Sequence, residues 1–448
     1  MPATSRLQTI CLALAVGLVL SDSSIVVLAL PEILARFDLS VVGVSWVLTG
    51  FNVVLALVAV PVAHLVRRRA PGVLLLVGLA VFAAASLSCA LAPSFAVLLV
   101  ARAVQAVGGA VAVTAALEIL PVTTGSERRA AVVWATAGAL GAACGPALGG
   151  VLTQLISWEA IFFVQVPAIL LALPTLRVRT HPVPAPAGRP HVAANVALAL
   201  LSAGLTAALF LIVLLMIEGW QMQPLPTALV VTVMPVSAIV GARLLGRVGS
   251  LPVRAASGTV LLAGGLASLA LLPHPAWQWT VPGQILVGVG IGLTIEALTD
   301  AALHGRSPQA VHGGWTLAAR HVGLVVGILL LTPLFSHQLD VQQAQVERTG
   351  VRLLLDSPLP LSTRLGLASR LGVVASGAGG RIPDLGEVFG DPPAEPAARA
   401  AWVALEQGLR ASIREAGTAA AAWPFLGAAA LVLLALVPIG IGRRHLDL

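Results

Sequence analysis

Hydrophobic residues come in long runs along the chain, each about as long as a membrane-spanning helix. A helix needs roughly 20 apolar residues to cross the hydrocarbon core of a bilayer. The runs predict twelve spans, near residues 7–31, 42–65, 72–91, 94–117, 130–154, 159–178, 193–217, 225–248, 251–272, 278–303, 313–336 and 419–442. The pattern therefore predicts an all-α polytopic membrane protein.

The composition supports this prediction. Of the 448 residues, 58% are hydrophobic and 10% are charged, whereas soluble domains carry about 25% charged residues. The net charge of +7 comes without a basic stretch interleaved with aromatic residues, so we expect no nucleic-acid partner. No nucleophile paired with a base, no paired histidine ligands and no phosphate loop occur. We therefore expect no enzyme activity, no metal site and no cofactor.

The arginines indicate how the chain is oriented. Short cytoplasmic loops retain arginine, and arginines stand at 67–69 after span two, at 128–129 after span four and at 443–444 near the end of the chain. All fall on one side when the spans are counted, and the opposite short loops hold almost none. We expect both termini in the cytoplasm and the spans in the inner (plasma) membrane.

Two segments differ from the short turns. Residues 179–192 contain four prolines, which predicts a stiff cytoplasmic linker between an N-terminal six-helix half, residues 1–178, and a C-terminal half, residues 193–448. Residues 337–418 hold most of the charge outside the short loops. They predict a long external loop between spans eleven and twelve.

Apolar residues recur at helical spacing within 337–418, which predicts two amphipathic helices. Their apolar faces are Leu361, Leu365, Ala368 and Leu371 in one, and Trp402, Leu405, Leu409 and Ile413 in the other. In the second helix the opposite face carries Arg399, Glu406, Arg410 and Arg414. The loop either packs on itself in solvent or binds the membrane surface or an external partner.

The two halves match each other when residue numbers are shifted by a constant 182. The matches pair Arg102–Glu118 with Gln284–Asp300, Gly141 with Gly323, Gly145 with Gly327, and His64 with Gly246. One shift that serves three pairs of spans predicts a duplicated six-helix unit. Such a unit places its binding site between the halves, near the midplane of the membrane.

Short motifs in the first half carry a family resemblance. The first span reads SDSSIVVLALPEI (Ser21–Ile33), span four has the pattern Arg-x-x-Gln-x-x-Gly at 102–108, and span five reads GALGAACGPALGG. These segments resemble the major facilitator superfamily and, within it, the twelve-span form of the drug:proton antiporter branch. The resemblance implies two pseudo-symmetric six-helix bundles and secondary active transport by alternating access.

The same resemblance assigns roles to particular residues. It places Gln105 and Gly108 along the substrate cavity. The antiporter motif falls on Gly138, Gly141, Gly145, Pro146 and Gly149, and the gating loop after span two on His64, Arg67, Arg68 and Arg69. This loop keeps the arginines but has Val60, His64 and Arg67 where the family usually has Gly, Asp and Gly.

Five charged residues lie inside spans, away from the turns: Asp22, Arg102, Glu296, Asp300 and Arg320. A charge at the bilayer centre costs roughly 2.5 to 3.5 kcal/mol on insertion scales. Asp22 and Arg102 should lie at similar depth, so we predict a pair that lines the cavity of the first half. Either protonation of Asp22 frees Arg102 and couples proton entry to substrate release, or the pair is a static link between helices.

Glu296 and Asp300 lie one turn apart on span ten, at a depth comparable to that of Arg320 on span eleven. One of them is predicted to pair with Arg320. The pair is either a second protonation site or a structural pair that holds the halves closed.

The glycines of span five also predict close helix packing, because small residues let a neighbouring backbone approach. We expect the neighbour to be span eight or eleven, and Pro146 to kink the helix.

Two functions fit these features. The first is proton-coupled export of hydrophobic or amphiphilic small molecules, with the lipid bilayer, a lipophilic substrate and protons as partners. The second is export of a lipid or cell-envelope precursor, assisted by an external partner protein at 337–418.

Overall fold

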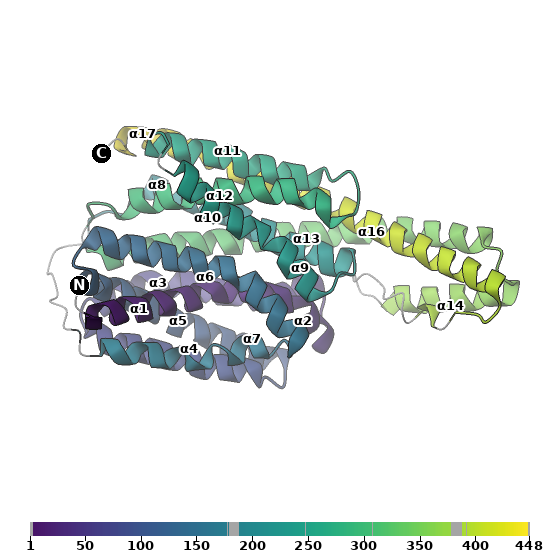
Figure 1. Ribbon diagram of the computed structural model, residues 1–448, viewed down its shortest axis with the longest axis horizontal. Helices are drawn as coiled ribbons and strands as arrows, with labels where there is room; N and C mark the ends of the chain where they lie inside the picture. The colour runs from purple at the N-terminus through teal and green to yellow at the C-terminus, as the bar shows by residue number, and fades with distance from the viewer. Residues whose placement is uncertain are drawn as a thin grey trace.

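In the computed structural model, the protein is a bundle of long helices from which a narrower helical extension projects (Figure 1). The structure describes residues 3–176, 178, 188–246, 248–306, 308–377, 388–390 and 392–446. These residues contain helices and no strand. Among them, eleven helices are long and apolar enough to cross a membrane. The predicted all-α polytopic fold is confirmed.

The first half of the chain contains the first six predicted spans. Its helices are α1 (Ala3–Ile25), η1 (Val26–Ala29), α2 (Leu30–Arg36), α3 (Val41–Val66), α4 (Pro71–Ala90), α5 (Phe95–Thr124), α6 (Glu127–Leu155), α7 (Ala160–Phe163) and η2 (Val166–Thr175). The first span comprises α1, η1 and α2; its 3₁₀ turn η1 precedes Pro31, which lacks an N–H group. The predicted sixth span, 159–178, is the shorter apolar segment Ala160–Thr175.

The second half contains the remaining spans. Its helices are α8 (Val192–Leu214), the π-helical turn η3 (Leu215–Gly219), α9 (Pro224–Val231), α10 (Val233–Leu245), α11 (Leu251–Ala270), η4 (Trp277–Thr280), α12 (Val281–Leu303), α13 (Gln309–Asp356), α14 (Leu361–Gly377), α16 (Pro396–Leu433) and α17 (Leu436–Leu446). Of the predicted linker 179–192, residues 179–187 lie outside the described residues.

Serine and glycine form the short turns of the first half. The hydroxyls of Ser40, Ser94 and Ser126 accept hydrogen bonds of 3.0 to 3.4 Å from backbone N–H groups at the starts of α3, α5 and α6. This satisfies a donor that the helix itself cannot pair. Gly125 ends α5 at a φ of 69°, a left-handed conformation that glycine adopts readily.

The sequence repeat is visible in the packing. A Cβ atom at Gly141 of α6 would collide with the backbone oxygen of Gly17 in α1. A Cβ atom at Gly323 of α13 would collide with the backbone oxygen of Ala199 in α8. The partners Gly17 and Ala199 are separated along the chain by the same shift as the two glycines. Spans one and five therefore pack as spans seven and eleven do, which confirms the two pseudo-symmetric bundles.

The halves share their largest core at one end of the bundle, and they also touch near the other end, where Gln309 Nε2 of the second half donates to the carbonyl of Glu127 at 3.1 Å. The start of α1 and the end of α17 lie at the other end, termed here the terminal face (Figure 1). The largest hydrophobic core joins the second half to first-half residues from the distal end, such as Ile25, Val44 and Trp158. Near the terminal face the first half has a separate core, to which the second half contributes Leu317 and Ala318.

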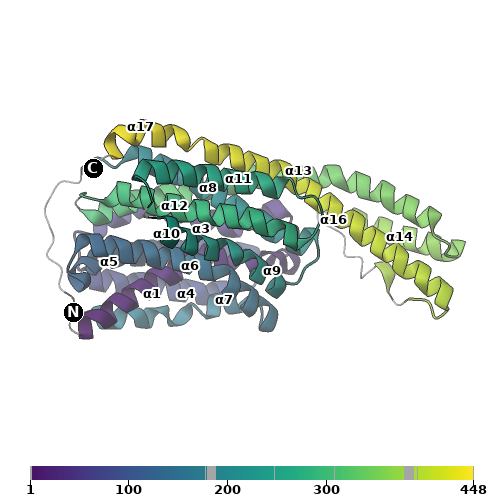
Figure 2. The same cartoon turned by 45° about the horizontal axis from the view of Figure 1, so that its top comes forward.

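Residues 337–418, predicted as a long external loop, are largely a helical extension of spans eleven and twelve. α13 has 48 residues and α16 has 38, whereas a span needs roughly 20. Both helices continue side by side beyond the bundle, with α14 next to them (Figure 2). Falling hydropathy ended the predicted span at residue 336, but hydropathy reports burial in lipid and not backbone conformation.

The extension has a hydrophobic core of its own. Trp402, Leu405, Leu409 and Ile413 are all buried, so the predicted amphipathic helix within α16 is confirmed. The ring of Trp402 meets that of Phe389 edge to face, at 5.4 Å between centroids.

The second predicted amphipathic helix is present as α14; of its predicted apolar face, Leu371 packs against the core of the extension, whereas the two leucines before it do not. Leu361 and Leu365 are 64% and 62% exposed, whereas Leu367 is 2% exposed. Periodicity identifies an apolar stripe, but it does not determine which side of the helix a partner covers.

Candidate functional site

Asp22 of α1 and Arg102 of α5 form an ion pair inside the first half. Arg102 Nη1 lies 2.5 Å from Asp22 Oδ2, and both side chains are fully buried. The predicted pairing of these two residues is present. Its role in proton coupling stays a prediction.

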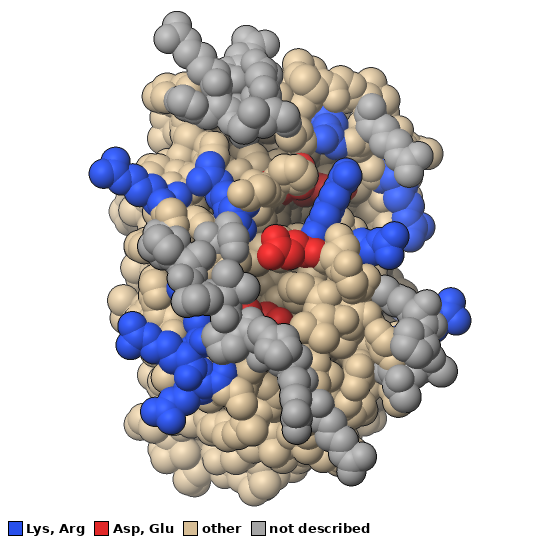
Figure 3. Space-filling model, turned by 90° about the vertical axis from the view of Figure 1, so that its left-hand side faces the viewer, with Lys and Arg blue, Asp and Glu red and all other residues tan. Residues whose placement is uncertain are grey.

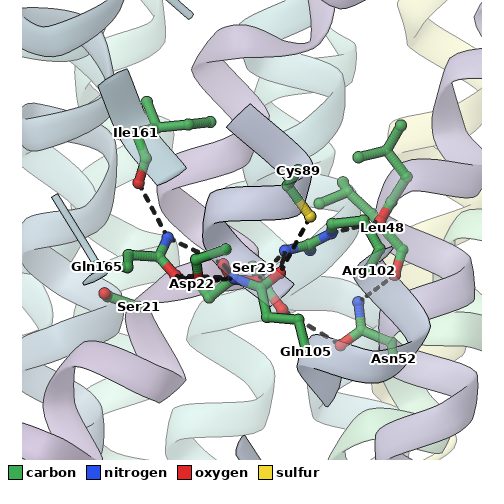
Figure 4. A network of polar contacts seen from close by, with 12 residues as sticks. Ser21, Asp22, Ser23, Leu48, Asn52, Cys89, Arg102, Gln105, Ile161 and Gln165 are labelled. Carbon is green, nitrogen blue, oxygen red and sulfur yellow. Dashed lines mark hydrogen bonds and ion pairs between the residues drawn. The ribbon is translucent and has the colours of Figure 1, made fainter. Parts of the chain in front are cut away.

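Two glutamines extend the pair into a network (Figure 4). Asp22 Oδ1 accepts hydrogen bonds from Nε2 of Gln105 at 3.2 Å and from Nε2 of Gln165 at 3.0 Å. Gln105 Oε1 in turn accepts from Arg102 Nη1 at 2.6 Å, and its Nε2 lies 2.8 Å from Ser86 Oγ. The carboxylate is thus bonded by side chains of spans four and six.

The remaining contacts of Arg102 are with the backbone and with aromatic rings. Its Nε donates to the carbonyl of Val47 at 3.2 Å. Its guanidinium carbon lies 4.3 Å from the ring centroid of Phe51 and 5.7 Å from that of Phe162, distances typical of cation–π contacts. Nη2 has no hydrogen-bond partner among the described residues.

A second polar chain crosses from the first half to the second. Ser23, next to Asp22, donates to Asn52 Oδ1 of α3 at 3.3 Å. Nδ1 of His321 in α13 lies 2.6 Å from the same oxygen, and both Asn52 and His321 are buried. This contact joins spans two and eleven across the interface of the halves.

The networks contain four residues that were not predicted to belong to them: Gln165, Ser86, Asn52 and His321. One signal could have marked them, because each is a polar residue inside a largely apolar run. Their partners depend on how the helices are rotated, which the run does not reveal.

The predicted pairing of Arg320 with Glu296 or Asp300 is wrong. Glu296 and Asp300 are both exposed on α12, and Asp300 lies 3.6 Å from His304 one turn further on. Arg320 is half-buried and makes no ion pair or hydrogen bond with a described residue. Equal depth in two spans does not make their side chains face each other.

The antiporter-motif glycines pack against span one. Atoms of α1 and η1 lie closest to Cβ positions built on these glycines: Leu20 at Gly138, Gly17 at Gly141, Ser24 at Gly145 and Ile25 at Gly149. The expectation that this stripe faces span eight or eleven is therefore wrong. Gly150, the next residue, does approach span eight, at Ala228 of α9. Pro146 lies inside α6, which continues as one helix.

The two residues predicted along the cavity are both enclosed. Gln105 is fully buried in the Asp22 network. A Cβ atom at Gly108 would lie 2.5 Å from the backbone nitrogen of Phe82 in α4, so Gly108 packs against that helix and has no room to line a cavity.

The predicted gating loop follows α3. His64, Arg68 and Arg69 are exposed, whereas Arg67 is half-buried and its charge acts on Glu118 of α5. Figure 3 shows the terminal face, which is hollowed at its centre. Acidic side chains lie in and beside the hollow, and arginines surround it (Figure 3).

Comparison with known proteins agrees with this architecture. A tetracenomycin C resistance and export protein of Streptomyces glaucescens is 37% identical over 166 residues, which cover 36% of this chain and 31% of that protein. The multidrug efflux pump LfrA of Mycolicibacterium smegmatis is 37% identical over 190 residues, 40% of this chain and 38% of the pump. The chain thus spans about a third of the length of these relatives.

A solved structure shares the fold of the whole chain. It is a bacterial homologue of the human lysosomal transporter Spinster in an inward-facing, unoccupied conformation, with a TM-score of 0.63, 17% identity and 98% coverage of both chains. The family model of the Major Facilitator Superfamily matches residues 12–332. The chain belongs to the Major Facilitator Superfamily.

Proposed function

We propose that the protein exports hydrophobic or amphiphilic small molecules across the plasma membrane in exchange for protons, by alternating access. The observation that carries this proposal is the buried network around Asp22, which holds an ionisable group inside the membrane. Relatives described as export and multidrug efflux proteins support the direction of transport. The largest core shared by the halves includes the distal end, and the terminal face is hollowed, which fits one of the two states of the cycle.

Asp22 can couple a proton to this cycle because its charge holds the network together. Protonation removes the negative charge and one acceptor, which weakens the hold on Arg102. The guanidinium then turns toward a new acceptor, and its Nη2 has no hydrogen-bond partner among the described residues. Since Ser23 bonds Asn52 and Asn52 contacts His321, a shift of α1 reaches the interface between the halves.

The terminal face is the cytoplasmic side in this proposal. Arginines after α3 and at the start of α6 lie there, as the positive-inside rule requires of cytoplasmic loops. The linker 179–192 then joins the halves in the cytoplasm, and the extension lies outside the cell. Cysteine labelling from one side of the membrane tests this orientation, with single cysteines at Arg68 and at Arg364.

Proton flux in reconstituted vesicles tests the coupling. We expect substrate addition to move protons in the wild type, and Asp22→Asn to reduce that flux at least about tenfold, because the neutral amide cannot exchange a proton. Asp300→Asn is the matched control, since Asp300 is exposed and outside the network. Undiminished flux in a well-expressed Asp22→Asn variant would refute the coupling role and leave the static link between helices.

The second candidate function is export of a lipid or cell-envelope precursor with an external partner. It is favoured because hydrogen bonds fix the extension to the end of span seven. Arg410 of α16 donates to Gln221 at 2.9 Å, beside the end of span seven, and Trp220 donates to Thr418 at 2.9 Å. Residues 351–408 could be replaced by a short Gly/Ser turn, because Gly350 of α13 lies next to Leu409 of α16. Drug efflux should survive this deletion, whereas partner-assisted lipid export should fail.

A further inference from the structure

Arg320 is a cation within span eleven that has no counter-charge among the described residues. It lies seven residues inside the predicted span 313–336, about 10 Å along the helix at 1.5 Å per residue. Its side chain keeps partial access to solvent, and no described residue pairs with it. Arg102, the other arginine at such depth, is paired with Asp22.

The position of Arg320 on α13 directs it away from lipid. Residues seven apart share a face of a helix, and Trp315, Val322 and Leu329 form a face on which each residue is 41 to 47% exposed. Arg320 lies on another face, between Gly313 and Gly327.

These two glycines show what that face contacts. A Cβ atom at Gly313 would meet Leu117 of α5 in the first half, and one at Gly327 would meet Ala203 of α8 in the second. Arg320 therefore lies at the seam between the two halves, on the inner side of α13.

The neighbouring residue holds this turn of the helix in place. His321 contacts Asn52 of α3 at 2.6 Å, so the backbone that carries Arg320 is tied to the first half. At the equivalent place of the repeat, the first half has Gly138, which packs on Leu20. The charge is thus a feature of span eleven alone and is not needed for the packing that the halves share.

A charge at this depth costs roughly 2.5 to 3.5 kcal/mol on insertion scales, and a second molecule can offset it. We propose that Arg320 binds the oxyanion of an amphiphilic substrate, a carboxylate or a phosphate, at the seam between the halves. The planar guanidinium fork matches both groups in a bidentate manner. The proposal rests on the export function above, for which it names the class of substrate.

Equilibrium binding to the purified full-length protein in detergent tests the proposal without requiring transport. The probes are fluorescent pyrenebutyrate, its neutral methyl ester and the cation tetraphenylphosphonium. We expect pyrenebutyrate to bind more tightly than the ester. Arg320→Gln should weaken pyrenebutyrate binding about 10- to 100-fold, the effect of one lost charge-assisted hydrogen bond, and should change the other two by less than about twofold.

Two further variants keep the test decisive. Arg320→Lys retains the charge without the fork and should recover part of the affinity, whereas Arg243→Gln, at an exposed arginine of α10, should change nothing. Equal binding of pyrenebutyrate and its ester by the wild type, or unchanged binding by Arg320→Gln, would overturn the proposal. If Arg320→Gln does not fold, the wild-type preference and Arg320→Lys still decide it.

A competition experiment distinguishes a lipid phosphate from a small carboxylate as the source of the oxyanion. Phosphatidylglycerol added to the detergent should displace pyrenebutyrate if a lipid phosphate occupies the site, and should leave it bound if the site prefers a small carboxylate. Failure of the proposed export function can be told apart from failure of the binding proposal. In that case neither probes nor protons would move across vesicles, while binding in detergent would persist.

Discussion

The two halves share a backbone arrangement but differ at the positions that hold polar groups. Glycines of spans five and eleven contact spans one and seven in the same way. At the shift of 182, however, polar residues of the first half match less polar ones in the second: Asp22 matches Gly204, Asn52 matches Met234, Arg102 matches Gln284 and Gln105 matches Val287. A Cβ atom at Gly204 would already collide with Val432, so no carboxyl group fits there. Both halves thus share the packing of small residues, whereas the polar network occurs in the first half and is not required for that packing.

Span eleven reverses this difference. Arg320 and His321 stand where span five has Gly138 and Ala139. Each half therefore has one charged feature that the other lacks: an enclosed ion pair in the first, and in the second an arginine at the seam that no described residue pairs with. In the functions proposed above, the first half handles the proton and the second the substrate.

The largest expected difference between the halves is the loss of stability when Arg102 of span four or its counterpart Gln284 of span ten is replaced. Arg102→Met leaves the Asp22 carboxylate buried without its counter-charge, which should destabilise the protein by about 3 to 5 kcal/mol. Gln284→Met removes one hydrogen bond, to Thr280 at 2.9 Å, and should cost about 1 kcal/mol. Reversible unfolding in detergent micelles measures both.

The double variant Asp22→Asn with Arg102→Met is the control for this comparison. It removes both charges, so most of the lost stability should return. Equal losses from Arg102→Met and Gln284→Met would mean that the ion pair contributes nothing specific to the first half.

The packing glycines should respond equally in the two halves. Gly141→Ala and Gly323→Ala each place a methyl group against a backbone oxygen, and overpacking of this kind costs about 1 to 3 kcal/mol. Gly264→Ala in α11 is the control, because its Cβ would meet nothing within 4 Å. It should raise stability slightly through helix propensity. Unfolding midpoints that fall for only one of the two packing variants would contradict a shared arrangement.

The sequence alone predicted the features of the fold that depend on hydropathy and spacing. Apolar runs identified the spans, the shift of 182 identified the repeat, and depth along the spans paired Asp22 with Arg102. Depth was sufficient there because both residues also happen to face each other. The same reasoning failed for Glu296 and Arg320, whose helices direct them apart.

Other features depend on contacts that a single helix does not encode. The extension was predicted as a loop because its helices are more polar than the spans, so that hydropathy gives no signal, although the amphipathic spacing of Trp402, Leu405 and Leu409 still indicated a helix. Gln165 joins Gln105 from 60 residues away, and His321 reaches Asn52 from 269 residues away. The first contact follows from how the helices are rotated within one half, and the second from how the two halves dock.

The smallest expected effect concerns that last contact, the buried hydrogen bond between Asn52 and His321. Asn52→Met introduces the residue that the second half has at the equivalent place, and His321→Leu removes the other partner. A hydrogen bond contributes about 0.5 to 1.5 kcal/mol, so a double-mutant cycle of unfolding free energies should show coupling of that size. Ser23→Ala is the control, since its bond to Asn52 is longer, at 3.3 Å, and should show weaker coupling to His321. Strict additivity of Asn52→Met and His321→Leu would mean that this hydrogen bond does not help to hold the halves together, and that a shift at Asp22 has no polar route through Asn52 to the seam where Arg320 lies.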